Sequence, residues 1–249
     1  MAIRTGLLLL TAVLGIATVC LAQHALRPEF QVASVKLDPP LQPGERYSAN
    51  LGTARNGTVT LSNATLSDCI KFAYELSSDS QIFGPDWIKS REVRFDIVGK
   101  TDPRTDRDEL LLMLQSLLAD RLKLEVHEER RPLQFYALVQ DPRGTKIATS
   151  NPDQNSSVAT INSRGRIVNS RLLMSGLATL LSRFEREIVI DMTGLERPFD
   201  VRLEWDADNV TGPSLFTALQ EQLGLKLESR KGPMDVLVVD YAERTPDEN

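Results

Sequence analysis

The sequence predicts an α+β protein of two tandem related modules, each a mainly antiparallel sheet packed on two helices in the order β-β-α-β-α-β-β. Two observations predict this fold. A series of short motifs occurs twice in the same order, roughly a hundred residues apart. The segments between these motifs show either the period-two alternation of half-buried strands or the wider spacing of amphipathic helices. Because alternating strands bury one face only, we expect antiparallel sheets with helices on that face.

The two copies of the motif series share residue types as well as order. The first copy contains Gly57–Ser62, Arg94–Ile97, Leu114–Gln115, Leu122–Glu125, Pro132 and Phe135–Val139. The second copy contains Gly165–Ser170, Pro198–Val201, Leu219–Gln220, Leu225–Glu228, Pro233 and Val236–Val239. A solenoid would need three or more repeats of about 20–50 residues each. We therefore expect two modules, at residues 23–150 and 151–249.

The first module is expected to begin with a strand and a hairpin. Residues 30–36 alternate between apolar and polar side chains and predict a strand, which the prolines that follow end. Residues 47–51 and 58–62 predict a hairpin, because Asn56 and Gly57 between them tolerate positive φ.

A capped helix should follow the hairpin. Thr65 supplies the cap, and apolar residues recur at helical spacing as far as Tyr74. Gly84–Pro85 ends that region, and we expect Trp87 and Ile88 to pack beside it.

The rest of the first module is predicted as strand, helix and two strands. Residues 93–97 alternate, and residues 102–106 place acids at the positive end of a second helix. Residues 122–126 and 135–139 predict two further strands, with the charged residues 128–131 and Pro132 as the hairpin connection between them.

The second module repeats this order. A short strand at 146–150 ends the first module, and a polar interdomain connection at 151–157 leads into the second. The predicted elements of the second copy are a hairpin turn at 163–165, a helix at 174–184, a strand at 199–205, a helix at 214–223 capped by Ser214, strands at 225–227 and 236–239, and a polar tail at 243–249.

Residues 1–22 have the pattern of a secretory signal peptide. Arg4 precedes a mostly apolar, uncharged stretch, and Cys20 and Ala22 place small residues at positions −3 and −1 before Gln23. Two alternatives are an uncleaved N-terminal anchor and lipidation of Cys20, although Val19 is larger than the residue a lipoprotein signal has there. We expect a periplasmic or secreted protein with no stable membrane span after signal removal.

The charge of the mature chain argues against nucleic acid as a partner. Removing residues 1–22 takes away Arg4 alone among the 29 basic residues, which leaves 28 against 34 acidic ones and a formal charge of −6. Binding to nucleic acid or to anionic lipid needs a clustered basic surface. Cys69 is the one cysteine left, so no internal disulfide can form, and we expect it to be a small buried residue.

The sequence carries no familiar catalytic or metal-binding motif. The residues contain no HExxH, CxxC, GxSxG, SxxK or glycine-rich phosphate loop. Residues 206–209 resemble the start of a calcium loop, but Val210 stands at the third ligand position, so we expect a solvated turn. We therefore predict no catalytic residue, no metal site and no cofactor.

One surface of the first module is the candidate functional surface. It comprises Trp87, His127, Glu128 and Glu129, because the second copy has no counterpart of His127 or of the Trp87 segment. His127 is the one histidine outside the extreme N-terminal region, so a hydrolase site assembled in space would have to involve it. Phe95–Asp96 and Phe199–Asp200 recur in both copies; we expect core phenylalanines and aspartates that accept hydrogen bonds from the backbone of nearby turns, with a shared pocket as the alternative.

Several longer segments together resemble an uncharacterised family of exported proteins from soil bacteria of the Acidobacteria. The resemblance covers nearly all of the mature chain and rests on residues 30–36, 84–87, 94–97, 113–124, 127–130, 136–139, 194–195, 223–228 and 246–249. The family's activity is unknown, so the resemblance implies no catalytic residues. Some relatives carry a similar domain fused to a membrane metallopeptidase of the antibiotic-sensor type, which implies a sensing or binding role outside the cytoplasm.

A weaker similarity is to the small N-terminal modules of secretins and TonB-dependent receptors. It rests on Thr65–Asp68 and Leu223–Leu227 and concerns the fold alone. We expect a non-enzymatic binding or assembly protein that binds an envelope protein, most directly by strand addition at a sheet edge. The alternatives are a sensing domain that works with a membrane metallopeptidase and a hydrolase with its site near His127. The sequence does not give the oligomeric state.

Overall fold

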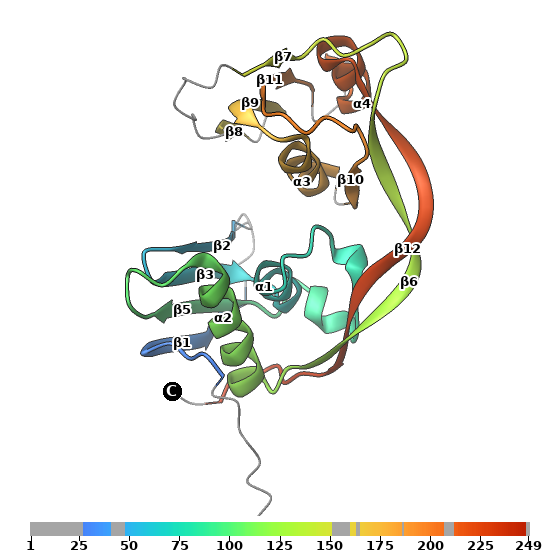
Figure 1. Cartoon of the computed structure of the whole chain (residues 1–249). Helices are drawn as coiled ribbons and strands as arrows, with labels where there is room; N and C mark the ends of the chain where they lie inside the picture. Colours follow the sequence, from blue (N-terminus) through green and yellow to red (C-terminus); the bar gives the residue numbers. More distant parts are fainter. Residues whose placement is uncertain are drawn as a thin grey trace, which may run out of the picture.

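The computed structural model describes residues 27–40, 48–150, 160–162, 165–185, 187–206 and 212–247. In this part of the chain four α-helices and three mostly antiparallel sheets form an α+β fold, which confirms the predicted class. Figure 1 shows two lobes joined along one side by a long ribbon of two strands.

The first lobe is a four-stranded antiparallel sheet with two helices. Its strands are β1 (Val32–Leu37), β2 (Asn50–Arg55), β3 (Thr58–Ala64) and β5 (Phe95–Lys100), in the order β1-β5-β3-β2. Alternate residues of β5 are buried, and they share one core with helices α1 (Leu66–Ala73) and α2 (Arg107–Leu122). The helices therefore cover one face of this sheet, as predicted.

The second lobe has the same kind of sheet. Its strands are β7 (Ala148–Thr149), β8 (Thr160–Asn162), β9 (Arg166–Leu172) and β11 (Phe199–Glu204), in the order β7-β11-β9-β8. Its core includes residues of α3 (Met174–Glu185), of α4 (Leu215–Ala218) and of the π-helical segment η3 (Leu219–Leu223) that continues α4.

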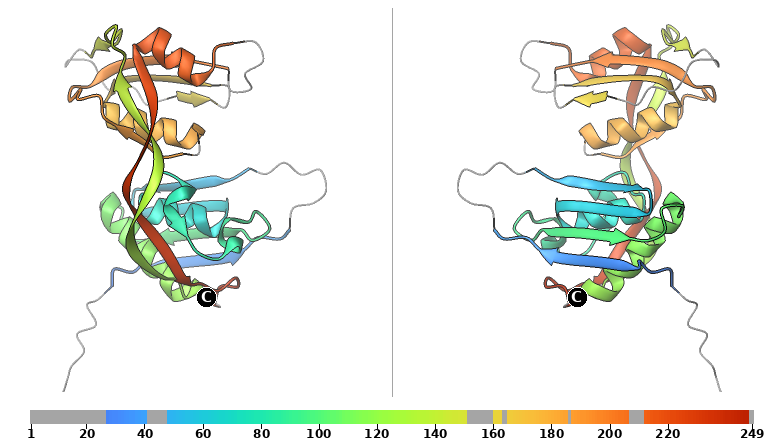
Figure 2. Two further views of the ribbon diagram at one scale, coloured as in Figure 1. Left: turned by 90° about the vertical axis from the view of Figure 1, so that its right-hand side faces the viewer. Right: turned by 90° about the vertical axis from the view of Figure 1, so that its left-hand side faces the viewer.

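The ribbon consists of two long antiparallel strands, β6 (Glu125–Gln140) and β12 (Leu225–Tyr241). Short strands flank it at its two ends: β4 (Ile82–Phe83) runs parallel to β12, and β10 (Val189–Asp191) runs parallel to β6. Figure 2 shows β6 and β12 twisting around each other between the lobes.

The predicted break in each of these strands is wrong. Pro132 and Pro233 lie opposite each other inside the ribbon, and residues 128–131 continue β6 instead of forming a hairpin connection. Proline is tolerated here because β4 and β10 pair only near the ends of the ribbon. In the middle, each strand has an outer edge where a residue without an N–H loses no ladder hydrogen bond.

Local sequence explains the turns and helix ends of the first lobe. Asn56 and Gly57 both have positive φ, 50° and 66°, and form the tight hairpin turn between β2 and β3. Thr65 and Asp68 form a reciprocal capping box at α1, so the predicted cap is confirmed. Asp106 caps α2 by accepting a hydrogen bond from Glu109 N.

The two Phe-Asp pairs each stabilise a bulge in a sheet. Asp96 Oδ1 accepts a 2.9 Å hydrogen bond from the backbone N of Asn63, a residue with φ 55° at a register shift between β3 and β5. Asp200 Oδ1 accepts a 3.2 Å bond from the backbone N of Arg171, which has φ 62° and lies beside the shift between β9 and β11. The prediction that these aspartates bind backbone donors is therefore confirmed, and Phe95 and Phe199 are buried core residues as expected.

Other predicted elements agree with the structure within a few residues. The helices at α1, α2 and α3, the hairpin β8–β9 and the cap at Ser214 are present, Cys69 is fully buried, and Ile88 lies in the core with Trp87 packed against it. The signal peptide, the connection at 151–157, Ser163, Arg164 and most of the proposed turn at 206–209 lie outside the described residues. The boundary between modules at residue 150 stays a prediction.

Candidate functional site

The candidate residue His127 lies on the ribbon between two carboxylates. It is the third residue of β6 and pairs with Val238 of β12. Its Nδ1 is 2.7 Å from Oδ2 of Asp240, and its Nε2 is 3.0 Å from Oε1 of Glu129. A neutral imidazole has one N–H donor, whereas two ionised carboxylates can only accept. This geometry therefore fits the doubly protonated imidazolium.

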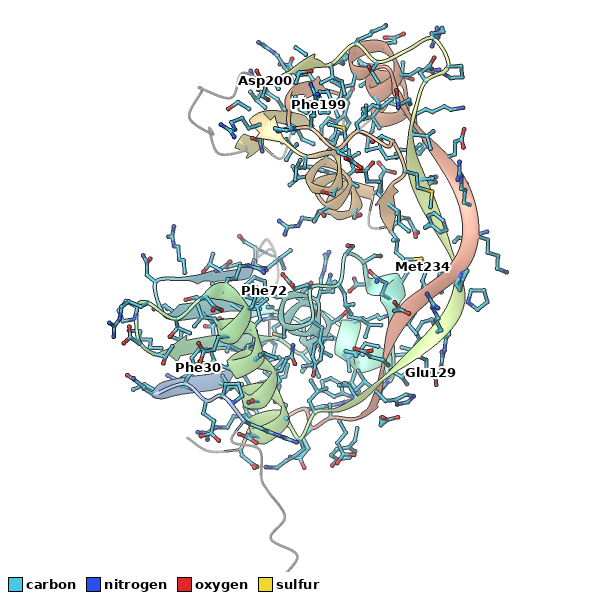
Figure 3. All side chains as sticks on the ribbon, viewed as in Figure 1. Phe30, Phe72, Glu129, Phe199, Asp200 and Met234 are labelled. Atoms are coloured by element: carbon cyan, nitrogen blue, oxygen red, sulfur yellow. The ribbon has the colours of Figure 1, made fainter. Side chains whose placement is uncertain are left out.

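The network continues along the same face of the ribbon. Glu129 is two residues from His127 and from Arg131, so the three side chains share one face of β6. Arg131 Nε donates a 2.6 Å hydrogen bond to Oε2 of Glu129, and the Arg131 guanidinium carbon lies 4.3 Å from the centre of the Phe83 ring in β4. Figure 3 labels Glu129 on the ribbon. The result is a line of alternating charges from Asp240 to Arg131.

These contacts change the acidity of the groups involved. Hydrogen bonds to Asp240 and then to Glu129 raise the pKa of His127 above its ordinary value of 6.5. The hydrogen bond from Arg131, followed by that from His127, lowers the pKa of Glu129 to about 2. Both shifts favour the charged forms of His127 and Glu129.

We expect the network to contribute a pH-dependent part of the stability. Because the pKa of His127 is raised in the folded state, its contribution is complete below pH 6.5 and is lost as the pH rises through the raised value. An NMR titration of the His127 ring should give a pKa above 6.5, and Asp240→Asn should lower it, with Glu128→Gln as the control. A ring pKa that Asp240→Asn leaves unchanged would contradict this role.

The structure does not bring all four predicted surface residues together. His127 and Glu129 are in direct contact, as the sequence suggested. Glu128 pairs with Leu237 and faces the opposite side of the ribbon. Trp87 lies in the 3-10 helix η2 (Asp86–Lys89), half-buried against the first core, with the Arg244 guanidinium carbon 5.5 Å from its ring centre.

Sequence reasoning missed two members of the network. Arg131 follows Glu129 at strand spacing, so the period of two would have placed it on this face had residues 128–131 been recognised as strand. Asp240 is 113 residues from His127, and only the pairing of β6 with β12 brings it close.

The arrangement at His127 limits the acid–base chemistry of this histidine in its protonated form. An imidazolium held by two carboxylates has no lone pair with which to act as a general base. Within the described residues, no cluster of three or more histidine, cysteine, aspartate or glutamate side chains has the geometry to hold a metal ion.

Fold and site together define a two-lobed α+β protein whose lobes share a central β-ribbon. Residues 67–242, from the second residue of α1 to the residue after β12, match the family model described as "Protein of unknown function (DUF3738)", and the chain belongs to this family. The expected membership of an uncharacterised family is confirmed to that extent. Neither the curated proteins nor the solved structures gave a match. No helix within the described ranges is long and apolar enough to span a membrane.

Proposed function

We propose that the chain is an exported, non-enzymatic binding protein built from two related α+β modules. The relation between the modules is supported by the two sheet orders, β1-β5-β3-β2 and β7-β11-β9-β8. In each, the chain supplies an edge strand, a hairpin, a helix, a short ribbon-flanking strand, a central strand, a helix and finally one strand of the ribbon.

Equivalent backbone contacts support the same relation. Gly57 O accepts a hydrogen bond from Thr101 N at 2.8 Å, and Gly165 O accepts one from Trp205 N at 2.7 Å. Both glycines have positive φ, and both lie in a hairpin beside the end of the central strand. Together with the bulges at Asp96 and Asp200, these contacts fit one ancestral module.

Where the last helix of each lobe leads into the ribbon, the alignment of the two copies in the structure differs by two residues from the alignment given by the sequence motifs. Lys123 and Gly224 both have left-handed backbone, φ 49° and 63°, and each follows the last helix of its lobe. Leu122 precedes this position whereas Leu225 follows it, so Leu122–Glu125 and Leu225–Glu228 are not equivalent. When Lys123 is aligned with Gly224, Pro132 is aligned with Pro233, as the motif series requires.

The observation that carries the binding function is the edge strand β1. It pairs with β5 over six residues without a bulge, and it exposes 67% of Val32 and 47% of Leu37. Among the other edges of the two lobe sheets in the described ranges, β7 has two residues, β8 has three, and β2 contains a register shift at Gly52. The open outer edges in the middle of the ribbon each contain a proline, Pro132 or Pro233, which has no N–H to donate. Long, regular edges are the ones that accept an extended partner segment.

Two proline substitutions test strand addition at β1. Successive N–H groups of a strand point to opposite sides, so of Ala33→Pro and Lys36→Pro one removes an outward donor and the other removes a hydrogen bond to β5. In pull-downs from envelope extracts, we expect the variant that lacks the outward N–H donor to lose the partner captured by the wild type. The Tm of this variant should stay the same.

The control is Val98→Thr, which changes an exposed residue of the adjacent strand β5 and should retain the partner. If the thermally intact proline variant captures the same partner as the wild type, strand addition at β1 is wrong. Capture of a membrane metallopeptidase would favour the sensing version of the function that the family resemblance suggested.

A further inference from the structure

The two long strands exchange places between the lobes. β6 begins directly after α2 of the first lobe, and its far end lies in the second lobe. β12 begins directly after η3 of the second lobe and ends in the first. Each lobe is therefore completed by a long strand that belongs to the other half of the sequence, as Figures 1 and 2 show. The second lobe also contains the short edge strand β7, which precedes residue 150 in the sequence and pairs with β11.

The first lobe depends on the end of β12. Leu237 and Val239 are 3% and 4% exposed and belong to the first core. β4 pairs with Leu237 and Val238 in parallel register. Beyond the strand, Glu243 N donates a 2.7 Å hydrogen bond to Leu122 O, and Lys123 forms an ion pair with Asp247.

The second lobe depends in the same way on the end of β6. Leu138 is fully buried in the second core, and the β10 pairing covers Tyr136 to Leu138. Gln140 Nε2 donates a 2.7 Å hydrogen bond to Thr193 O. Asp141, 4% exposed, accepts a 2.6 Å bond from Gln220 Nε2 of η3.

The middle of the ribbon connects the end of β12 in the first lobe with the end of β6 in the second lobe. Phe135, Ala137 and Ile188 form a small third core, against which Leu133 and Met234 pack. Figure 3 labels Met234 between the two lobes. The pairing of β6 with β12 runs without interruption through this region, from Gln140 and Leu225 to Val126 and Val239.

We propose that residues 27–150 and 160–247 are obligate halves that recognise each other by strand exchange, independently of the chain that connects them. Each half carries a donor strand and an acceptor site, and the two surfaces are complementary. The acceptor site of a first half can therefore be filled by the second half of another copy, so the partner this surface fits is a second copy of the chain. The inference does not rest on the proposed binding at β1.

A nicked chain tests the recognition of the halves. A protease site inserted within residues 151–159 of the full chain is cleaved after folding, with the uncut chain as control. We expect the fragments to co-elute at the volume of the uncut protein, and the Tm of the nicked protein to rise with concentration, because its unfolding has become dissociation. Separation of the fragments in native buffer, or a separate concentration-independent transition for each, overturns the proposal.

Two full-length variants with different tags test exchange between copies. Leu237→Asp changes only the second half of its chain, whose donor strand then places a charge in the first lobe. Leu138→Asp changes only the first half of its chain, whose donor strand then places a charge in the second lobe. Co-expressed, the undamaged first half of one chain and the undamaged second half of the other can form one intact pair. We expect the two tags to co-purify as a soluble heterodimer, whereas each variant alone is lost to aggregation. If the tags do not co-purify, or if each variant alone is soluble with a wild-type Tm, exchange between copies is wrong.

Discussion

Leu237→Ala should lower the free energy of unfolding by about 2–5 kcal/mol, the usual cost of removing a buried leucine side chain. Leu237 is 3% exposed and packs in the first lobe, although its sequence belongs to the second half. The two tryptophans provide the readout, because Trp87 lies against the first core and Trp205 in the second. If strand exchange couples the lobes, both fluorescence signals should move to the same lower denaturant midpoint.

Leu112→Ala is the matched control for this substitution. Leu112 lies on α2 of the same lobe, but half of it is exposed, so its removal should change stability by no more than about 0.5 kcal/mol. A Leu237→Ala variant in which Trp87 unfolds early while the Trp205 midpoint stays at the wild-type value would show that the lobes unfold independently. The coupling through the ribbon would then be too weak to make the halves obligate.

The parts of the fold that depend on local chemistry could be predicted from the sequence. The Asn56–Gly57 turn, the Thr65 cap and the Ser214 cap follow from side chains within a few residues of the backbone groups that they bind or from the φ they tolerate. The role of Asp96 could also be predicted, because an aspartate at the same place in both copies suggested a common backbone partner.

The ribbon could not be predicted, because proline has opposite meanings in different surroundings. A proline interrupts a central strand but is tolerated in a strand whose outer edge is free. Pro132 is in the second situation, and nothing near it in the sequence distinguishes the two. The same error hid the charge network, since treating residues 128–131 as a turn removed the alternation that aligns His127 with Arg131. Asp240 requires the pairing of two strands from different halves.

Gly165→Ala should be strongly destabilising for a change that adds a single methyl group. Gly165 has φ 76°, which costs an alanine about 1 kcal/mol. An alanine Cβ would also lie 2.3 Å from the carbonyl oxygen of Trp205, so the backbone would have to move, at a further cost of about 1–3 kcal/mol. Urea denaturation should therefore show a loss of about 2–4 kcal/mol in total, the sum of these two costs.

Gly194→Ala separates the two costs. Gly194 has a similar φ of 69°, but no atom lies within 4 Å of the position its Cβ would take, so this variant should lose only about 1 kcal/mol. Gly57→Ala should resemble Gly165→Ala, because its Cβ would lie 2.4 Å from the carbonyl oxygen of Asp102 at the corresponding place in the first lobe. Equal losses at Gly57 and Gly165, both larger than at Gly194, are expected if one ancestral hairpin was copied with its backbone contact. A loss at Gly165 no greater than at Gly194 would remove that contact as support for the duplication.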